Sequence, residues 1–290
     1  MDWLQPYAHI VRRRAFLRFL GVGGSMAALG AGAGGTAVGA VQHLDDARGR
    51  EDGAYGGTAA GSQRILWSAA TGDRTVAFTF DDGPNPLYTS RVLDILGARG
   101  VRATFFMIGR LAQQHPDLVR AVVAAGHEIG NHSWSHLSPA LIGAGTAGIE
   151  VARGGDAIAA VAGTRPLWYR PPRGMITGAV LCHSAQAGQS VAMWSVDRGG
   201  GADGDAGAVR DHVVASLAPG AIIDLHDGLG RSSWDLATAK AHTLMRRREA
   251  ELHALAAILD ASLAAGYRFA TITDLAALPA HDPNGRPAAA

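Results

Sequence analysis

The stretch Thr79-Phe80-Asp81-Asp82-Gly83-Pro84 says most about how this chain folds. It closes an alternating run that begins at Val76, and such a run predicts a buried strand. Gly83 and Pro84 predict a loop directly after that strand. Two adjacent carboxylates are therefore expected at a strand end, where scaffolds commonly present catalytic groups. Neighbouring carboxylates resist joint ionisation unless a cation lies beside them, so the pair indicates a cation site; a solvated turn is the alternative.

Two histidines follow about fifty residues later, in the stretch Gly130-Asn131-His132-Ser133-Trp134-Ser135-His136. On a helical turn, side chains four residues apart share one face and can bind one metal ion. Neutral imidazole suits zinc and similar ions, and a carboxylate would complete a three-ligand site. The spacing alone is weak evidence, because surface histidine pairs are common. Joined to Asp82, it gives the hypothesis of an Asp–His–His metal site.

Two further strand-end segments carry charged or titratable side chains. Arg170 follows the apolar pair Trp168-Tyr169 and precedes two prolines, which restrict the backbone. His226 ends the short apolar run that starts at Ala221. Taken singly, each residue could have only a structural role at a turn of the chain. Together with the aspartates and the histidine pair, they predict one site assembled from several loops.

The ordered motifs TFDDGP, HSWSH, RPPRG, WSVD and DLHD resemble those of the polysaccharide deacetylase family, the NodB-homology domain. The resemblance covers roughly residues 63 to 278. It implies an α/β fold, a distorted (β/α) barrel, and a hydrolase that removes N- or O-acetyl groups from carbohydrate. It also implies one divalent metal ion, with zinc favoured and cobalt, manganese or nickel as alternatives.

The same resemblance implies a role for each residue of the first three motifs. Asp82, His132 and His136 would hold the metal. Asp81 would be the general base that deprotonates the attacking water, and Arg170 would keep Asp81 anionic and oriented. This chemistry suits an amide, because its carbonyl is a poor electrophile and needs both a Lewis acid and an activated water.

The remaining motifs imply the leaving-group side of the site. His226 would be the general acid, and Asp197 would orient and tune it. An amine leaves badly as an anion, and a histidine with a carboxylate neighbour can supply the proton. The backbone N–H of Arg173 would help to hold the oxyanion, and Leu225 and Trp194 would face the substrate.

The sequence departs from the family pattern at two places. Arg173 stands where an aromatic residue is usual, and Arg198-Gly199-Gly200-Gly201 follows Asp197 where a second aspartate and a tryptophan are expected. Both changes remove aromatic walls near the substrate. Trp134, Trp194 or Trp234 could replace that surface, or could belong to the core.

The composition limits the number of domains and the class of protein. The 290 residues are 48% hydrophobic, which suffices for one large domain of about 220 residues and an N-terminal extension. The net charge of +1 argues against a general nucleic-acid binder. The single cysteine, Cys182, excludes an intrachain disulfide framework.

The N-terminus resembles a twin-arginine export signal. Arg13 and Arg14 precede an uncharged stretch rich in Ala and Gly, so residues 1–42 are predicted to be a signal peptide or an uncleaved anchor. Residues 43–62 are predicted to be a flexible linker, and the tail 279–290 to be disordered. The protein would use the twin-arginine machinery and be exported. It would touch the membrane only if the segment stays uncleaved.

Strands and helices alternate from residue 75 onward, which supports parallel strands. Strands are expected near 75–80, 102–108, 190–196, 221–225 and 268–272, and helices at 87–98, 117–125, 146–161 and 209–217. Ser232–Ala265 is expected to be a long helical insert, with Arg246-Arg247-Arg248-Glu249 on a solvated face.

These observations favour an exported deacetylase of peptidoglycan amino sugars. A deacetylase of chitin oligomers or acetyl-xylan is the alternative within enzymes. A catalytically weakened protein that binds the cell wall is the alternative from another class, motivated by the altered third and fourth motifs.

Overall fold

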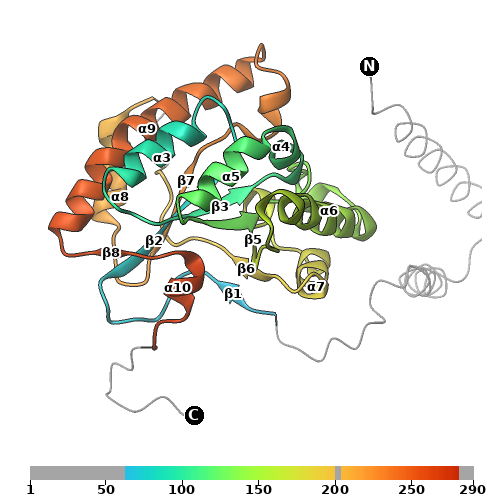
Figure 1. Cartoon of the computed structure of the whole chain (residues 1–290), viewed down its shortest axis with the longest axis horizontal. Coiled ribbons are helices and arrows are strands. Elements are labelled where there is room, and N and C mark those ends of the chain that lie inside the picture. Colours follow the sequence, from blue (N-terminus) through green and yellow to red (C-terminus); the bar gives the residue numbers. More distant parts are fainter. Residues whose placement is uncertain (1–62, 200–203, 281–290) are drawn as a thin grey trace, which may run out of the picture. The chain divides into compact units, whose positions relative to one another are not determined.

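The computed structural model describes residues 63–199 and 204–280 (Figure 1). The predicted signal and linker lie outside these residues, as does most of the predicted tail. Within the described ranges, no helix combines the length and the apolar character needed to cross a membrane.

The described residues build an eight-stranded sheet in which every strand pair is parallel. The order along the sheet is β1-β6-β5-β4-β3-β2-β7, and β8 pairs with β2. The strands are β1 (Ile65–Leu66), β2 (Thr75–Asp81), β3 (Thr104–Met107), β4 (Glu128–Asn131), β5 (Trp168–Tyr169), β6 (Ser190–Ala192), β7 (Ile222–His226) and β8 (Arg268–Phe269).

The two ends of this strand order meet again. Ser68, just after β1, forms a bridge with Ala221, just before β7, and Val196 beyond β6 forms a parallel bridge with Ile223 in β7. The sheet therefore curls back on itself as an irregular barrel, with very short strands on the side of β1, β5 and β6.

From β2 onward, helices connect successive strands, and they surround the sheet (Figure 1). Helix α9 packs against α8 and α3, whereas α6 packs against α4, α5 and α7. The helices are α3 (Thr89–Gly97), α4 (Gly109–Gln114), α5 (Pro116–Ala124), α6 (Ala144–Ala162), α7 (Gly178–Gln186), α8 (Ala206–Ala215), α9 (Ala239–Ala264) and α10 (Ile272–Ala276). Short 3-10 turns are η1 (Pro139–Leu141), η2 (Pro172–Gly174) and η3 (Gly230–Trp234).

Strand β2 lies at the centre of the core, and all seven of its residues are buried. Phe80 stacks on Phe105 of β3, with ring centroids 5.1 Å apart. Burial on both faces is usual for parallel strands covered by helices. It fixes the end of β2, and therefore the position of Asp81 and Asp82.

The expected α/β alternation is confirmed, with boundaries that differ by a few residues. Strands β1, β4 and β5 were not predicted, because strands of two to four residues are too short to show a period. The helical insert is confirmed as η3 followed by α9. Its expected solvated face is wrong at Arg248, which is only 4% exposed because it packs against buried carboxylates.

Candidate active site

Four of the predicted motifs meet at one edge of the sheet. Asp81 ends β2 and His226 ends β7, and the two residues are direct neighbours in the pairing of these strands. His132 follows β4, and Arg170 follows β5, which pairs with β4 through Asn131 and Tyr169. The carboxyl ends of parallel strands lie on the same edge, and this brings distant motifs together.

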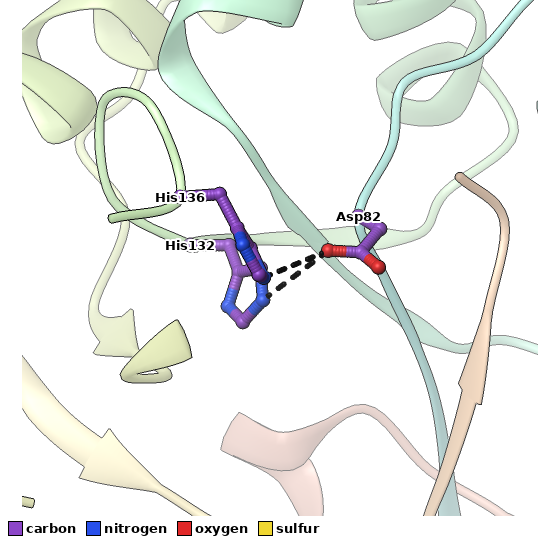
Figure 2. A group of neighbouring side chains, drawn as sticks. All are labelled: Asp82, His132 and His136. Atoms are coloured by element: carbon purple, nitrogen blue, oxygen red, sulfur yellow. Dashed lines mark ion pairs between the residues drawn. The ribbon is translucent and has the colours of Figure 1, made fainter. Parts of the chain in front are cut away.

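Asp82, His132 and His136 form the compact group that was predicted to bind metal. Their candidate ligand atoms all lie within 4.8 Å of one another. Figure 2 shows both imidazoles facing the Asp82 carboxylate; its Oδ1 lies 3.0 Å from His136 Nε2 and 3.7 Å from His132 Nε2. Two imidazole nitrogens and one carboxylate oxygen are a common donor set for zinc and related ions.

Three details of this group fit a bound cation. Asp82 Oδ1 is buried and, among the described residues, has no hydrogen-bond partner, although a histidine nitrogen lies so close. His132 Nδ1 lies 2.8 Å from the carbonyl oxygen of Arg170, which leaves Nε2 free as a ligand atom. Burial lowers the pKa of His132 to about 4, so that the imidazole is neutral near pH 7, as metal binding requires.

The histidine pair lies on a loop, so the expected helical turn is wrong. The loop is shaped by side chains that the motif reading did not use. Asn131 Oδ1 accepts a hydrogen bond from Ser133 N at 3.0 Å, and Ser133 Oγ accepts one from His136 N at 2.9 Å. Glu150 of α6 binds Ser135 through its backbone N–H and its hydroxyl, each at 2.8 Å.

Backbone strain is concentrated in the same loops. In the described ranges, the non-glycine residues with positive φ are Asp82, Ser133, His136 and Arg173, at 74°, 69°, 56° and 61°. This conformation is costly for residues with a Cβ, and it is found mainly where surrounding structure holds a functional group in place. Two of the three candidate metal ligands adopt it.

Arg170 holds the first aspartate. It is fully buried, and its Nη1 lies 2.8 Å from Asp81 Oδ1 and 3.0 Å from Asp224 Oδ1. Its remaining nitrogens donate to the carbonyl oxygens of Ala192 and Met193. Asp81 Oδ1 thus contacts the guanidinium, whereas Oδ2 faces the candidate metal ligands and lies 3.6 Å from His132 Nε2.

His226 is paired with a carboxylate that the sequence analysis did not identify. Glu251 of α9 accepts a hydrogen bond from His226 N at 2.8 Å, and the same Oε2 lies 3.3 Å from His226 Nδ1. Burial and Arg248 alone would lower the pKa of His226, but the carboxylates of Glu251 and Asp224 raise it to about 9. The imidazole is therefore protonated near neutral pH.

Glu251 is itself held between two arginines. Its Oε1 contacts Arg248 Nη1 and lies 3.0 Å from Arg198 Nε. Burial alone would raise the pKa of Glu251, but Arg248, the nearby His226 and Arg198 hold it below its usual value. Arg248 also donates to the carbonyl oxygen of Gly228 at 2.7 Å and lies 3.8 Å from Asp82 Oδ2. Helix α9 thus supplies part of the site.

The structure does not bring Asp197 to His226. The Asp197 side chain is 57% exposed, accepts a hydrogen bond from Gly199 N at 2.8 Å and lies 3.5 Å from His212 Nε2. Leu225, expected to face the substrate, is 1% exposed and packs in the core. Strand alternation explains this: Asp224 and His226 share one face of β7, so Leu225 points to the other.

The third motif lies beside Trp194. Arg173 is exposed and stands in η2, and a Cβ at the next residue, Gly174, would approach the Trp194 ring to 2.8 Å. Trp194 is partly buried and lies 5.5 Å from the Arg170 guanidinium. Trp134 and Trp234 are also partly buried, and each has an arginine over its ring.

A family model for polysaccharide deacetylases matches residues 68–192. A chitooligosaccharide deacetylase of Sinorhizobium fredii is 42% identical over 166 residues, which cover 57% of this chain and 77% of the relative. A peptidoglycan-N-acetylglucosamine deacetylase of Bacillus cereus is 35% identical over 213 residues, covering 73% of this chain and 92% of the relative. The chain belongs to the polysaccharide deacetylase family.

Solved structures agree with this polysaccharide deacetylase assignment. The crystal structure of a peptidoglycan N-acetylglucosamine deacetylase, in complex with an N-hydroxybenzamide, superposes with a TM-score of 0.65 and 26% identity. The match covers 76% of this chain and 96% of that one. It confirms the expected fold, a curled parallel barrel surrounded by helices.

Proposed function

We propose that this polysaccharide deacetylase removes N-acetyl groups from the amino sugars of peptidoglycan, using one divalent metal ion held by Asp82, His132 and His136. The proposal rests mainly on one observation: two adjacent carboxylates have different contacts. Asp82 Oδ1 faces two imidazoles, whereas Asp81 is held by a buried arginine. Zinc is the favoured ion, because two neutral imidazoles and a carboxylate suit it.

When bound, such an ion would polarise the acetyl carbonyl and make a water molecule acidic enough to be deprotonated near neutral pH. Asp81 is the proposed general base. Its Oδ1 is occupied by Arg170 at 2.8 Å, so Oδ2 is the oxygen available to accept the proton. The pairing with Arg170 fixes the direction of Oδ2.

His226 is the proposed general acid, which protonates the departing nitrogen. With Nδ1 directed at Glu251, the opposite ring nitrogen, Nε2, is the one that remains for the substrate. We propose Glu251 in place of Asp197 as the carboxylate that orients this ring, because Glu251 lies 3.3 Å from Nδ1 and Asp197 contacts His212. The backbone N–H of Arg173 is proposed to help hold the oxyanion, because the positive φ of Arg173 turns that part of the chain.

Peptidoglycan is proposed as the substrate because an exported bacterial enzyme meets the cell wall first. The relatives are named both for peptidoglycan and for chitooligosaccharides, so chitin oligomers remain the competing substrate. Export is proposed from Arg13 and Arg14. Replacing both with lysine should leave the protein in the cytoplasm, and continued export of the double variant would contradict that part of the proposal.

The substrate is tested by acetate release. The purified full chain is incubated with peptidoglycan, chitooligosaccharides and acetyl-xylan, after chelation and after addition of zinc, cobalt, manganese or nickel. We expect the highest kcat/KM on peptidoglycan and activity only with metal restored. A clear preference for chitooligosaccharides or acetyl-xylan would overturn the substrate assignment, and full activity after chelation would overturn the metal requirement.

A further inference from the structure

Two exposed arginines beside the site have no carboxylate partner among the described residues. Elsewhere on the surface, Arg91 and Arg165 each pair with an acidic side chain at 2.8 Å. Arg110 and Arg231 have no such partner in the part of the chain that the structure describes. Both lie over the same indole instead: the Arg110 guanidinium carbon is 4.5 Å from the centroid of Trp234, and that of Arg231 is 5.6 Å away.

Sharing one ring brings two positive charges close together. Their separation cannot exceed the sum of the two ring distances, which is about one Debye length at 0.1 M ionic strength. Stacking on tryptophan uses the face of a guanidinium and leaves its N–H edge available for a planar anion. An anion bound by both arginines would therefore relieve their repulsion and gain two charge-assisted interactions.

The arginine pair is fixed to the loops that carry the metal ligands. Arg231 Nη1 donates to the carbonyl oxygen of Ser135 at 3.2 Å, next to His136. The residue before it, Gly230, is so near the metal group that a Cβ there would lie 3.0 Å from Asp82 Oδ1. Arg110 is the second residue of α4, and its backbone N–H donates to the carbonyl oxygen of Trp134 at 3.0 Å.

Neighbouring segments add a third exposed arginine and two buried polar atoms without partners in the described ranges. Arg153 of α6 is exposed, lies 3.8 Å from the centroid of Trp134 and is also without a carboxylate partner in the described ranges. Segment η3 has two buried polar atoms, Ser233 Oγ and Trp234 Nε1, for which the described residues offer no hydrogen-bond partner. Unsatisfied polar atoms of this kind are rare and are expected where a ligand or ordered water completes a site.

We propose that Arg110 and Arg231, held against Trp234, form a subsite that binds a carboxylate of the glycan beside the sugar being deacetylated. The inference rests on the proposed function and narrows its substrate class to acetylated glycans that carry carboxylates. The lactyl group of muramic acid supplies one where no stem peptide is attached, and the stem peptide supplies one where it is. Chitin supplies none, so it gains nothing from this subsite.

The test compares kcat/KM of the full chain on peptide-free peptidoglycan strands and on the same strands with their carboxylates converted to neutral amides. The measured ratio is kcat/KM on strands with carboxylates divided by kcat/KM on strands with neutral amides. Arg110→Gln and Arg231→Gln should each lower this ratio about two- to fivefold, and the double variant should lower it further. Arg231→Lys should recover part of the ratio, since it keeps the charge. Arg120→Gln removes the same charge from the exposed face of α5 and is the matched control.

Strands that keep their stem peptides separate the two sources of carboxylate. A loss seen only with these strands assigns the subsite to the peptide carboxylate, and a loss seen already on peptide-free strands assigns it to the lactyl group. A ratio that is unchanged in the double variant on both kinds of strand, or that falls equally in Arg120→Gln, would overturn the subsite.

A binding measurement keeps this test separate from the proposed function. Calorimetry with fully deacetylated strands, one sample with stem peptides and one without, needs no catalysis. The double variant should bind at least one of the two kinds of strand more weakly than wild type. Failure of wild type to release acetate would count against the proposed function alone. Equal affinity of wild type and the double variant for both kinds of strand would overturn the subsite even in an active enzyme.

Discussion

Glu251 Oε2 lies 2.8 Å from the backbone N of His226 and 3.3 Å from its Nδ1. One carboxylate of helix α9 thus holds both the backbone and the ring of the residue that ends β7. Because two arginines hold the other oxygen of the same carboxylate, its position is fixed from both sides. This contact orients the His226 imidazole, and together with Asp224 it raises the pKa of His226.

The first prediction concerns the pH dependence of Glu251→Gln. The carboxylate of Glu251 is one of the charges that raise the pKa of His226 to about 9, so the proposed acid stays protonated below that pH and is lost above it. Removing the charge should move the alkaline limb of the kcat profile to lower pH. We also expect kcat to fall about 10- to 100-fold, as for other residues that orient a reacting group.

Two controls accompany this variant. Glu249→Gln changes a neighbouring surface carboxylate that pairs with Arg91, and it should leave the alkaline limb in place. Asp197→Asn should have a smaller effect than Glu251→Gln, since Asp197 contacts His212 instead. If Asp197→Asn moved the limb and Glu251→Gln did not, the assignment of the orienting carboxylate would be reversed.

The second prediction separates the two adjacent aspartates. Asp81→Asn should keep the metal and lose most activity, because an amide cannot accept the proton of the attacking water; general base catalysis is typically worth about 10²- to 10⁴-fold. Asp82→Asn should weaken metal binding itself. Metal content and acetate release are measured for both variants. Equal loss of metal in the two would contradict the division of roles.

The third prediction concerns stability. Arg170→Met would leave the buried carboxylates of Asp81 and Asp224 without their cation. Breaking a buried pair by removing one partner typically costs about 3–5 kcal/mol. Urea unfolding should show a loss of this size. Arg165→Met removes an exposed partner of Asp156 and should cost less than about 1 kcal/mol. Similar losses of unfolding free energy in both variants would show that the buried contacts of Arg170 contribute no more to stability than an exposed ion pair does.

The fourth prediction concerns Arg173, which is exposed in the structure. Its positive charge beside the proposed oxyanion position should favour acetylated sugars that carry a nearby carboxylate. Arg173→Tyr restores an aromatic side chain and should lower the preference, in kcat/KM, for acidic over neutral sugars. The backbone strain at this position is the same for tyrosine as for arginine. An unchanged preference would mean that the side chain takes no part in substrate selection.

The sequence was informative about the site wherever a residue ends a strand. Asp81, Asp82 and His226 were predicted at the ends of strands, and β2 and β7 place them there. Asp224 could also have been found, because it shares a strand face with His226 at a spacing of two residues. The helical turn at the histidine pair was wrong, since the positive φ of Ser133 and His136 is incompatible with a helix.

Glu251 could not have been found in this way. It lies 25 residues beyond His226 in a long helix, and only the packing of α9 against β7 brings the two together. The neighbouring run of arginines was interpreted as solvated because charged residues rarely occupy a core, yet Arg248 is buried where it neutralises Glu251. The pairing of His226 with Glu251 joins two elements and leaves no local pattern in the sequence, whereas Arg248 and Glu251 are three residues apart in one helix.

Asp82, His132 and His136 are the residues that we propose to hold the catalytic metal. Elemental analysis of the purified full chain compares wild type with His136→Ala, and His253→Ala is a control at an exposed histidine. We predict one divalent ion per chain and metal-dependent acetate release for wild type and His253→Ala, and neither for a folded His136→Ala. Stoichiometric metal in His136→Ala would contradict the claim.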